Sequence, residues 1–216
     1  NPNDVAISEE ETQYILKVAN DHFKKTLSPA DVVWSYSGVR PLLEDESSDP
    51  SAVTRDYTLH LDDKNHKAPL LSIFGGKITT YRKLALSAMT KLTPYFDNLG
   101  EAWTDSKPLP GGNLDMSLDA FAMKLQQDYP FIGANLARRF ANSYGTLTHT
   151  LLDKVNSESE LGQHFGNQLY QVEVDYLINH EWARSAEDIL WRRTKLGLEL
   201  TPDQVTTLEG YIQTKV

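Results

Sequence analysis

Cysteine is absent from the 216 residues of this chain, which excludes disulfides, iron–sulfur clusters, thiolate zinc sites and cysteine nucleophiles. Positive charge is scarce as well, because 21 Lys and Arg stand against 30 Asp and Glu and give a formal net charge of -9. Bulk charge of this sign does not hold nucleic acid or an anionic lipid surface, so we expect no nucleic-acid partner. Any anion that the chain binds must be captured by a few local groups.

Long apolar runs are missing too. No window approaches the roughly 20 apolar residues of a membrane-spanning helix, and no basic start with an apolar core marks a signal peptide. Any membrane contact is therefore expected to be peripheral. The chain opens at Asn1 without a methionine, which predicts a piece of a longer protein. The six histidines show neither helical metal-ligand spacing nor a His-Glu-x-x-His pattern, so we expect no metal site.

What is present indicates a folded α+β chain, with 40% hydrophobic and 24% charged residues. Ser8 and Glu11 have the spacing of a capping box and predict a helix over residues 9–25. Runs rich in β-branched and aromatic residues, or with alternating apolar residues, predict strands at 32–36, 53–61 and 70–74. The last strand enters Gly75-Gly76, after which apolar residues continue at helical spacing to Leu92.

A linker is predicted at residues 98–112, where Pro108, Pro110 and the pair Gly111-Gly112 concentrate chain-breaking residues. Everything after it has helical patterns, so we expect an all-α C-terminal helical domain. The predicted helices cover 117–128, 132–143, 146–155, 169–179, 186–196 and 202–214.

The stretch from Phe74 to Arg82 is the strongest candidate for a ligand-binding site. A glycine pair between a strand and a helix lets backbone approach a ligand closely, and the first helical turn offers free N–H groups at the positive end of the helix dipole. Lys77 adds a positive charge there, and Thr79 and Thr80 add hydroxyl donors. Such a site suits an anion or an electron-rich heterocycle. The alternative is an ordinary tight turn with a solvated lysine, because the pattern is not a P-loop.

Two arginines are further candidates. Arg40 lies just after a predicted strand, between Gly38 and Pro41, where its guanidinium could hold phosphate or carboxylate with two parallel hydrogen bonds. Pairing with a nearby acidic side chain on the surface is an equally good interpretation of Arg40. Arg55 shares a predicted strand face with Val53 and Tyr57, which favours a structural ion pair over ligand contact.

Several of these segments together resemble the FAD-dependent glycerol-3-phosphate dehydrogenases of the aerobic bacterial type. The resemblance is carried by Trp-Ser-Tyr-Ser-Gly-Val-Arg-Pro-Leu at 34–42, Thr-Arg-Asp-Tyr at 54–57, Phe-Gly-Gly-Lys-Ile-Thr-Thr-Tyr-Arg-Lys-Leu at 74–84, Pro-Gly-Gly at 110–112 and His-Glu-Trp-Ala-Arg-Ser-Ala-Glu-Asp-Ile-Leu-Trp-Arg-Arg-Thr-Lys-Leu-Gly-Leu at 180–198. The order and gaps match over essentially the whole chain. The departure is that no Gly-x-Gly-x-x-Gly unit for the FAD pyrophosphate occurs, so the chain looks like the carboxyl-terminal part of such an enzyme.

The resemblance implies a division of labour along the chain. Residues 1–97 would be the carboxyl-terminal part of an FAD- and substrate-binding domain, 98–112 the linker and 113–216 the helical domain. Arg40 and Lys77 would lie at the substrate pocket. Gly75, Gly76, Lys77, Ile78, Thr79 and Thr80 would face the flavin. The catalytic base would lie upstream, so no catalytic residue is assigned to this chain.

The implied reaction oxidises sn-glycerol 3-phosphate to dihydroxyacetone phosphate and passes electrons to a quinone. The resemblance implies a cytoplasmic protein, peripherally associated with the inner face of the cytoplasmic membrane. Without the missing N-terminal FAD-binding part, this chain alone is expected to retain no FAD and to be inactive. Two alternatives stay open: an oxidase of the same fold, which returns electrons to oxygen, and a non-enzymatic helical interaction module.

Overall fold

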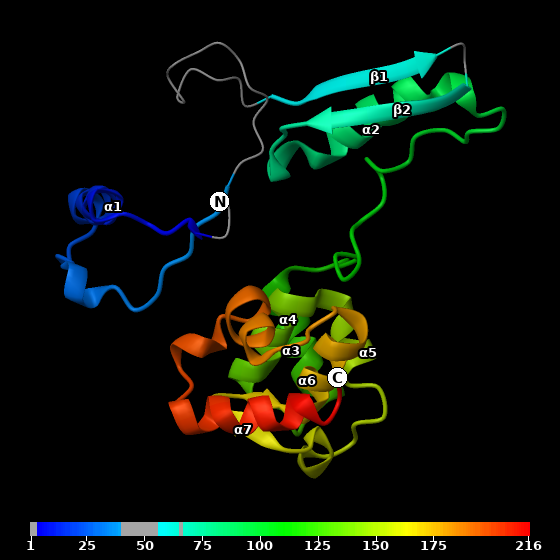
Figure 1. Ribbon diagram of the computed structural model, residues 1–216. Coiled ribbons are helices and arrows are strands. Elements are labelled where there is room, and N and C mark those ends of the chain that lie inside the picture. Colours follow the sequence, from blue (N-terminus) through cyan, green and yellow to red (C-terminus); the bar gives the residue numbers. More distant parts are fainter. Residues whose placement is uncertain (1–3, 40–55, 65–66) are drawn as a thin grey trace. The chain divides into compact units, whose positions relative to one another are not determined.

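The computed structural model describes residues 4–39, 56–64 and 67–216, and the chain divides into two compact units (Figure 1). Asn1–Lys107 is the first unit and Pro108–Val216 is the helical unit. The division falls within the Pro- and Gly-containing stretch 98–112. None of the helices over the described residues combines the length and apolar character that crossing a bilayer requires.

Helix α1 (Glu9–His22) opens the first unit and confirms the predicted helix, although it ends three residues early. Its capping box is formed: the Glu11 amide donates to Ser8 Oγ at 3.1 Å, and the Ser8 amide donates to Glu11 Oε2 at 2.9 Å. These two bonds satisfy backbone donors that the first turn would leave unpaired. One 3₁₀ turn, η2 (Pro29–Asp31), follows.

The strand predicted at 32–36 is wrong. The described residues 32–39 form no strand, and the rings of Trp34 and Tyr36 instead stack with their centroids 5.3 Å apart. A strand needs a neighbouring strand for its backbone N–H and C=O groups, and the two sheets in the described part of the chain do not include this segment. β-Branched and aromatic residues alone were therefore not enough to form a strand here.

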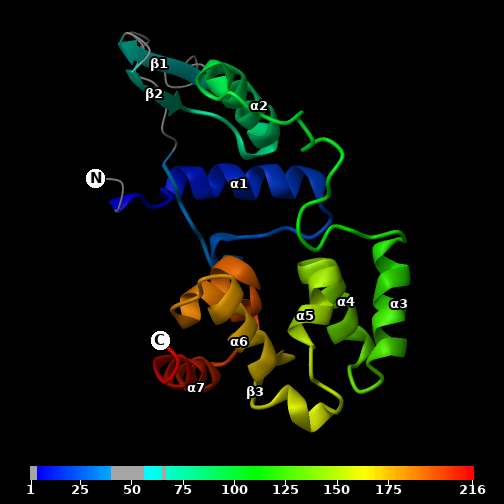
Figure 2. The same ribbon diagram turned by 90° about the vertical axis from the view of Figure 1, so that its right-hand side faces the viewer.

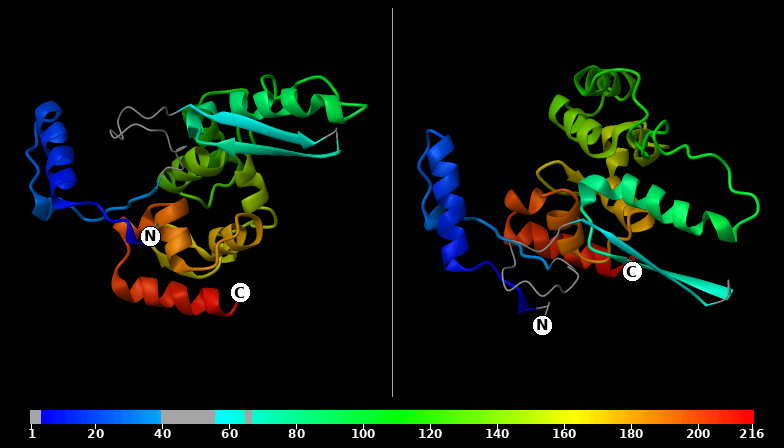
Figure 3. Two further views of the ribbon diagram at one scale, coloured as in Figure 1. Left: turned by 45° about the horizontal axis from the view of Figure 1, so that its top comes forward. Right: turned by 90° about the horizontal axis from the view of Figure 1, so that it is seen from above.

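The main elements in the rest of the first unit, over its described residues, are an antiparallel hairpin and helix α2. Strand β1 (Thr58–Lys64) pairs with β2 (Lys67–Phe74) from Thr58 opposite Phe74 to Lys64 opposite Lys67. The strand predicted at 53–61 has its first residues outside the described part of the chain, and the observed strand runs from Thr58 to Lys64. The strand predicted at 70–74 starts earlier, at Lys67. Helix α2 (Tyr81–Leu92) confirms the predicted helix after the glycine pair and runs alongside the hairpin (Figure 3).

The helical unit contains α3 (Leu118–Asp128), α4 (Ala134–Tyr144), α5 (Thr148–Leu151), α6 (Gln171–His180) and α7 (Pro202–Gln213). Helices α3 and α4 pack side by side (Figure 2). Three 3₁₀ turns, η5 (Gly145–Leu147), η6 (Glu158–Leu161) and η8 (Leu196–Leu198), join them. Five of the six predicted helices thus have an α-helix in their place, although the one expected at 146–155 is a single turn.

The expectation that this unit is all-α needs a correction. A small hairpin, β3 (His164–Gly166) with β4 (Leu169–Tyr170), lies before α6 and includes the start of the helix predicted at 169–179. The turn between its strands places Asn167 and Gln168 at φ 37° and 66°, in the left-handed region. Helical spacing alone does not reveal this turn, because Arg139 holds the Gln168 carbonyl at 2.9 Å from another part of the chain.

The helix predicted at 186–196 is also different in kind, because Asp188–Arg193 is a π-helix, η7. The amide and hydroxyl of Thr194 both donate to the Ile189 carbonyl, at 3.0 and 2.7 Å, which is the i to i+5 bonding of a π-turn. The Arg193 guanidinium donates to the Glu181 carbonyl at 3.0 Å and so draws this turn toward the end of α6.

The core lies almost wholly in the helical unit. Its fully enclosed side chains include Leu125, Phe140, Phe165, Leu177 and Ile189. In the described part of the first unit, only Leu16 and Ala88 are buried hydrophobic residues. The helical unit therefore closes a core of its own, whereas the described residues of the first unit do not.

Candidate functional site

The glycine turn (residues 75–80) joins the end of β2 to α2. Gly75 and Gly76 have φ angles of 73° and 104°, and Lys77 returns to extended backbone at -122°. Residues other than glycine rarely adopt such positive φ angles, so the backbone conformation requires glycine at both positions. A 3₁₀ turn, η3 (Ile78–Thr80), then leads into α2. The strand, glycine turn and helix predicted from the sequence are therefore present in that order.

A close approach adds a second constraint at Gly76. A Cβ atom on this residue would lie 2.9 Å from Leu84 Cδ1 and 3.9 Å from the Cβ of Tyr57. The turn thus rests against one side chain from α2 and one from the residue before β1. The backbone at Gly76 is held between the hairpin and the helix, and not free in a loop.

The first amides after the glycines are the ones that could bind a ligand. The first bond of the 3₁₀ turn runs from the Thr80 amide to the Lys77 carbonyl at 3.0 Å, and the Tyr81 amide then donates to the Ile78 carbonyl. The amides of Lys77, Ile78 and Thr79 come before this pattern begins and have no helical acceptor. Ile78 is 89% exposed, so a ligand can reach this turn from solvent.

The side chains of the turn divide into two kinds. Lys77 and Thr79 are exposed and able to meet a ligand. The Thr80 hydroxyl instead donates to the Lys77 carbonyl at 3.1 Å, so its proton is used within the turn. The Thr80 amide donates to the same carbonyl, at 3.0 Å, so both donors of Thr80 are used within the turn and the donor role expected of its hydroxyl is not available. The exposed groups are a lysine ammonium and a set of amides, which together attract an anion or a carbonyl oxygen.

Arg40 and Arg55 lie outside the described residues. The structure therefore brings together the predicted cofactor-binding residues from Gly75 to Thr80 and leaves the pairing of Arg40 with Lys77 a prediction. Sequence reasoning missed one member of the site. The Tyr57 hydroxyl lies 3.0 Å from Ser87 Oγ on α2. No local spacing links these two residues, because they lie 30 positions apart in the sequence.

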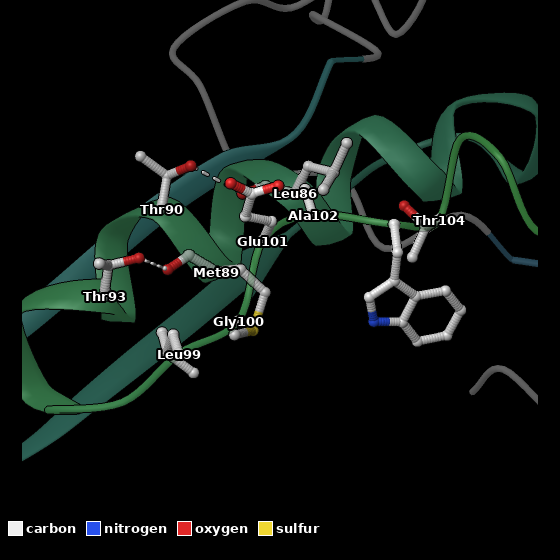
Figure 4. A pocket seen from close by; sticks show the side chains of 10 residues that line it. Leu86, Met89, Thr90, Thr93, Leu99, Gly100, Glu101, Ala102 and Thr104 are labelled. Atoms are coloured by element: carbon white, nitrogen blue, oxygen red, sulfur yellow. Dashed lines mark hydrogen bonds between the residues drawn. The ribbon is translucent and has the colours of Figure 1, made fainter.

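A separate cavity of about 540 Å³ lies on the second half of α2 (Figure 4). Apolar side chains such as Leu86, Met89 and Leu99 line it, and Glu101 is its one ionisable lining residue. The hydroxyls of Thr90 and Thr93 donate to carbonyls of their own helix, at 2.9 Å each, as the dashed lines in Figure 4 show. This cavity offers shape and apolar surface but few groups for chemistry.

The helical unit contains one buried polar cluster. Both Glu173 oxygens accept from the Arg139 guanidinium at 2.6 Å, and Glu173 Oε1 also accepts from the Tyr144 hydroxyl at 2.6 Å. The Glu173 side chain is fully buried, and the Arg139 side chain is 18% exposed. Burial, followed by the Glu173 charge, raises the pKa of Tyr144 far above its ordinary value. Both carboxylate oxygens of Glu173 already accept hydrogen bonds from within the cluster, so we interpret the cluster as structural.

These observations define the class of protein first. A helical domain with a closed core follows a hairpin-and-helix unit that presents a glycine turn at a helix N-terminus. Residues 102–214, more than half of the chain, match the family described as the C-terminal domain of alpha-glycerophosphate oxidase. The chain belongs to this family.

Curated relatives extend the likeness to the first unit. The chain is 56% identical over 214 residues to a glycerol-3-phosphate dehydrogenase of Pseudomonas aeruginosa and 51% identical over 211 residues to the aerobic glycerol-3-phosphate dehydrogenase of Escherichia coli. These alignments cover 99% and 98% of this chain but 42% of each relative. A D-erythritol 1-phosphate dehydrogenase of Brucella abortus is 44% identical over 199 residues, 92% of this chain and 39% of that protein.

Proposed function

We propose that this chain is the carboxyl-terminal part of an FAD-dependent dehydrogenase that oxidises sn-glycerol 3-phosphate to dihydroxyacetone phosphate. In this proposal residues 1–97 complete the FAD- and substrate-binding domain. The observation that carries it is the glycine turn, with exposed amides and Lys77, in a chain whose relatives are named glycerol-3-phosphate dehydrogenases. The chain spans about two fifths of the length of those relatives, so the remainder of the site would come from preceding sequence.

The glycine turn fits one edge of a flavin. FAD, when bound, supplies the acceptor for the hydride that leaves the substrate. The amides of Lys77, Ile78 and Thr79 would hold an electron-rich carbonyl edge of the ring. They sit at the N-terminus of α2, where the helix dipole stabilises negative charge. In comparable oxyanion sites, loss of one such donor costs about 3 kcal/mol.

Two cations would hold the substrate phosphate, namely Lys77 and Arg40. A dianion in a partly dry pocket is stabilised by charge-assisted hydrogen bonds, and an arginine can supply two in parallel. The substrate would be a phosphorylated polyol, since the Brucella relative is named for erythritol phosphate. Comparing oxidation of glycerol 3-phosphate with that of D-erythritol 1-phosphate distinguishes the two substrates.

The proposed electron acceptor is a quinone, with the protein in the cytoplasm and bound peripherally to the inner face of the membrane. An oxidase of the same fold is the second candidate, because the matched family is described by a glycerophosphate oxidase. The two differ in product: an oxidase forms one hydrogen peroxide for each substrate oxidised. Peroxide measured against dihydroxyacetone phosphate in the full-length protein decides between them.

Substitution of the two cations tests the site. In the full-length protein, Arg40→Ala and Lys77→Ala should each lower kcat/KM for glycerol 3-phosphate about 30-fold or more, because losing one partner of a desolvated charge pair costs about 2 to 5 kcal/mol. FAD content should stay within about twofold of the native protein. Lys83→Ala is the matched control, since Lys83 is an exposed lysine on α2, just after the turn. A loss below about threefold for both variants would contradict the proposal.

A further inference from the structure

Tyr57 spans the space between the glycine turn and α2. It is the residue before β1, whose first residue, Thr58, pairs with Phe74 at the end of β2. This register puts Tyr57 beside the glycines, and a Cβ on Gly76 would lie 3.9 Å from the Tyr57 Cβ. At the other end of the side chain, the Tyr57 hydroxyl lies 3.0 Å from Ser87 Oγ.

The α2 side of this contact is a single helix face. Leu84 and Ser87 are three residues apart and so share a face. Leu84 contacts the turn, since its Cδ1 would lie 2.9 Å from a Cβ on Gly76, and Ser87 holds the tyrosine hydroxyl. Ser87 is seven residues after Thr80, about two helical turns further along α2. Tyr57 therefore contacts the start of the site with its Cβ and the second turn of the helix with its hydroxyl.

The backbone that connects β2 to α2 does not by itself fix the direction of the helix. Two glycines join β2 to η3 and α2, and glycine restricts backbone direction less than any other residue. Side chains must then set the angle between the end of the strand and the first helical turn. Tyr57 is half-buried, lies next to Gly76 and reaches Ser87 on α2 with its hydroxyl, so its side chain links the turn to the helix.

We propose that Tyr57 is a positioning residue for the flavin-facing turn, and that its hydrogen bond to Ser87 fixes the direction of the amides from Lys77 to Thr79. The proposal rests on the function proposed above. Tyr57 transfers no proton in it. Its hydroxyl keeps the turn in one orientation, so that the amides meet the electron-rich edge of the cofactor without rearranging.

A second tyrosine of the same unit provides a matched control. The Tyr95 hydroxyl donates to Asp63 Oδ2 at 2.5 Å and so ties the end of the α2 region to β1. Its partner Asp63 lies at the far end of the strand from the glycine turn. Tyr57→Phe and Tyr95→Phe each remove one hydroxyl that joins the hairpin to the helical segment. Only the first removes the hydroxyl of a residue that touches the turn.

The test measures the two-electron reduction potential of the flavin in the full-length protein. Tyr57→Phe and Ser87→Ala should each make the potential more negative by about 14 mV or more, which is about threefold in the reduction equilibrium. They should lower kcat more than they raise KM. Tyr95→Phe should leave the potential unchanged, and Ser87→Thr, which keeps the hydroxyl, should restore it. In the flavin-free protein, hydrogen exchange of a peptide covering residues 75–84 should rise in Tyr57→Phe and not in Tyr95→Phe.

The outcomes separate this proposal from the one it rests on. If Lys77→Ala loses activity as expected while Tyr57→Phe changes neither the potential nor the exchange, the glycine turn is the site and the positioning role is wrong. Equal shifts in Tyr57→Phe and Tyr95→Phe would also overturn it, because they would reflect general loosening of the unit. If Lys77→Ala and Arg40→Ala have no effect, the proposed function itself fails.

Discussion

The two units differ in where their apolar side chains lie. The helical unit encloses large residues such as Phe140, Phe165 and Leu177 completely. The described part of the first unit leaves Leu70, Ile73 and Ile78 at 63%, 46% and 89% exposure. Burial of apolar surface is the main favourable term in folding, so the helical unit supplies its own stability. The described residues of the first unit enclose too few side chains to form a core of their own.

This difference has a topological cause. Helices close their contacts over short chain distances, and consecutive helices such as α3 and α4 bury one another. A two-stranded hairpin is marginal by itself, and α2 beside it buries only Ala88. The exposed apolar residues of the first unit are therefore consistent with the proposal that preceding sequence covers them. The candidate site lies in the less self-sufficient unit.

The largest expected effect is a complete loss. The chain purified alone should bind no FAD and oxidise no glycerol 3-phosphate, because the proposed pyrophosphate-binding half of the site is absent from its sequence. The visible absorption spectrum of the purified chain checks this. A stoichiometric flavin band would break the comparison, since it would show that the first unit assembles a complete site by itself.

The next effect concerns the buried cluster of the helical unit. Glu173→Ala should lower the free energy of unfolding by about 3 to 5 kcal/mol, because it leaves the Arg139 guanidinium without its carboxylate partner. Urea unfolding followed by circular dichroism measures it. Arg138→Ala is the control: its ion pair with Asp119 is exposed, at 66% and 76% for the two side chains, and should be worth less than about 1 kcal/mol. Equal losses of unfolding free energy in the two variants would show that the buried ion pair stabilises the unit no more than an exposed one does.

Limited proteolysis compares the units directly. Cleavage of the chain should begin within Asn1–Lys107, with Pro108–Val216 surviving at least about tenfold longer, because proteases act on segments that open easily. Mass spectrometry of the early products locates the cuts. Early cleavage inside α3, α4 or α7 would reverse the comparison.

The smallest effect is a pH dependence within the helical unit. A hydrogen bond from the Arg184 amide lowers the pKa of the Asp188 carboxyl, and Ser185 contributes in the same direction. A depressed folded-state pKa gives stability that is present above the ordinary aspartate pKa of about 3.9 and lost as the pH falls through the folded value. Asp188→Ala should therefore cost about 1 kcal/mol at neutral pH, and the cost should vanish in strong acid.

Thermal unfolding measured from about pH 2 to about pH 7 tests this dependence, because that range brackets the ordinary pKa of aspartate. Asp119→Ala serves as the control, since Asp119 makes one exposed ion pair. A cost for Asp188→Ala that stays constant over this range would mean that its charge is not what stabilises the π-helix.

Local signals predicted most elements near their own residues. The capping box of Ser8 and Glu11 marked the start of α1, and the structure has a second capping box, Thr201 with Gln204, at the start of α7. The glycine turn was found because a glycine pair between strand and helix patterns is visible in the sequence itself. The strand expected at 32–36 failed for the opposite reason, since strand formation depends on a partner.

Contacts between distant residues could not be found in this way. The pairing of Arg139 with Glu173 joins residues 34 positions apart, and the bond of Tyr57 to Ser87 joins residues 30 apart. Neither pair has a spacing that marks it in the sequence. The π-turn of Asp188–Arg193 likewise depends on Arg193 reaching back to the Glu181 carbonyl.

Capped helix starts, the glycine turn and the candidate residues of that turn could be recognised from the sequence, because capping and positive φ angles are set by residues a few positions apart. The tertiary structure decided which polar groups are buried together, which apolar faces are covered and what holds the turn in place. Those properties depend on the free energy of removing side chains from water. That free energy is fixed only when distant segments meet.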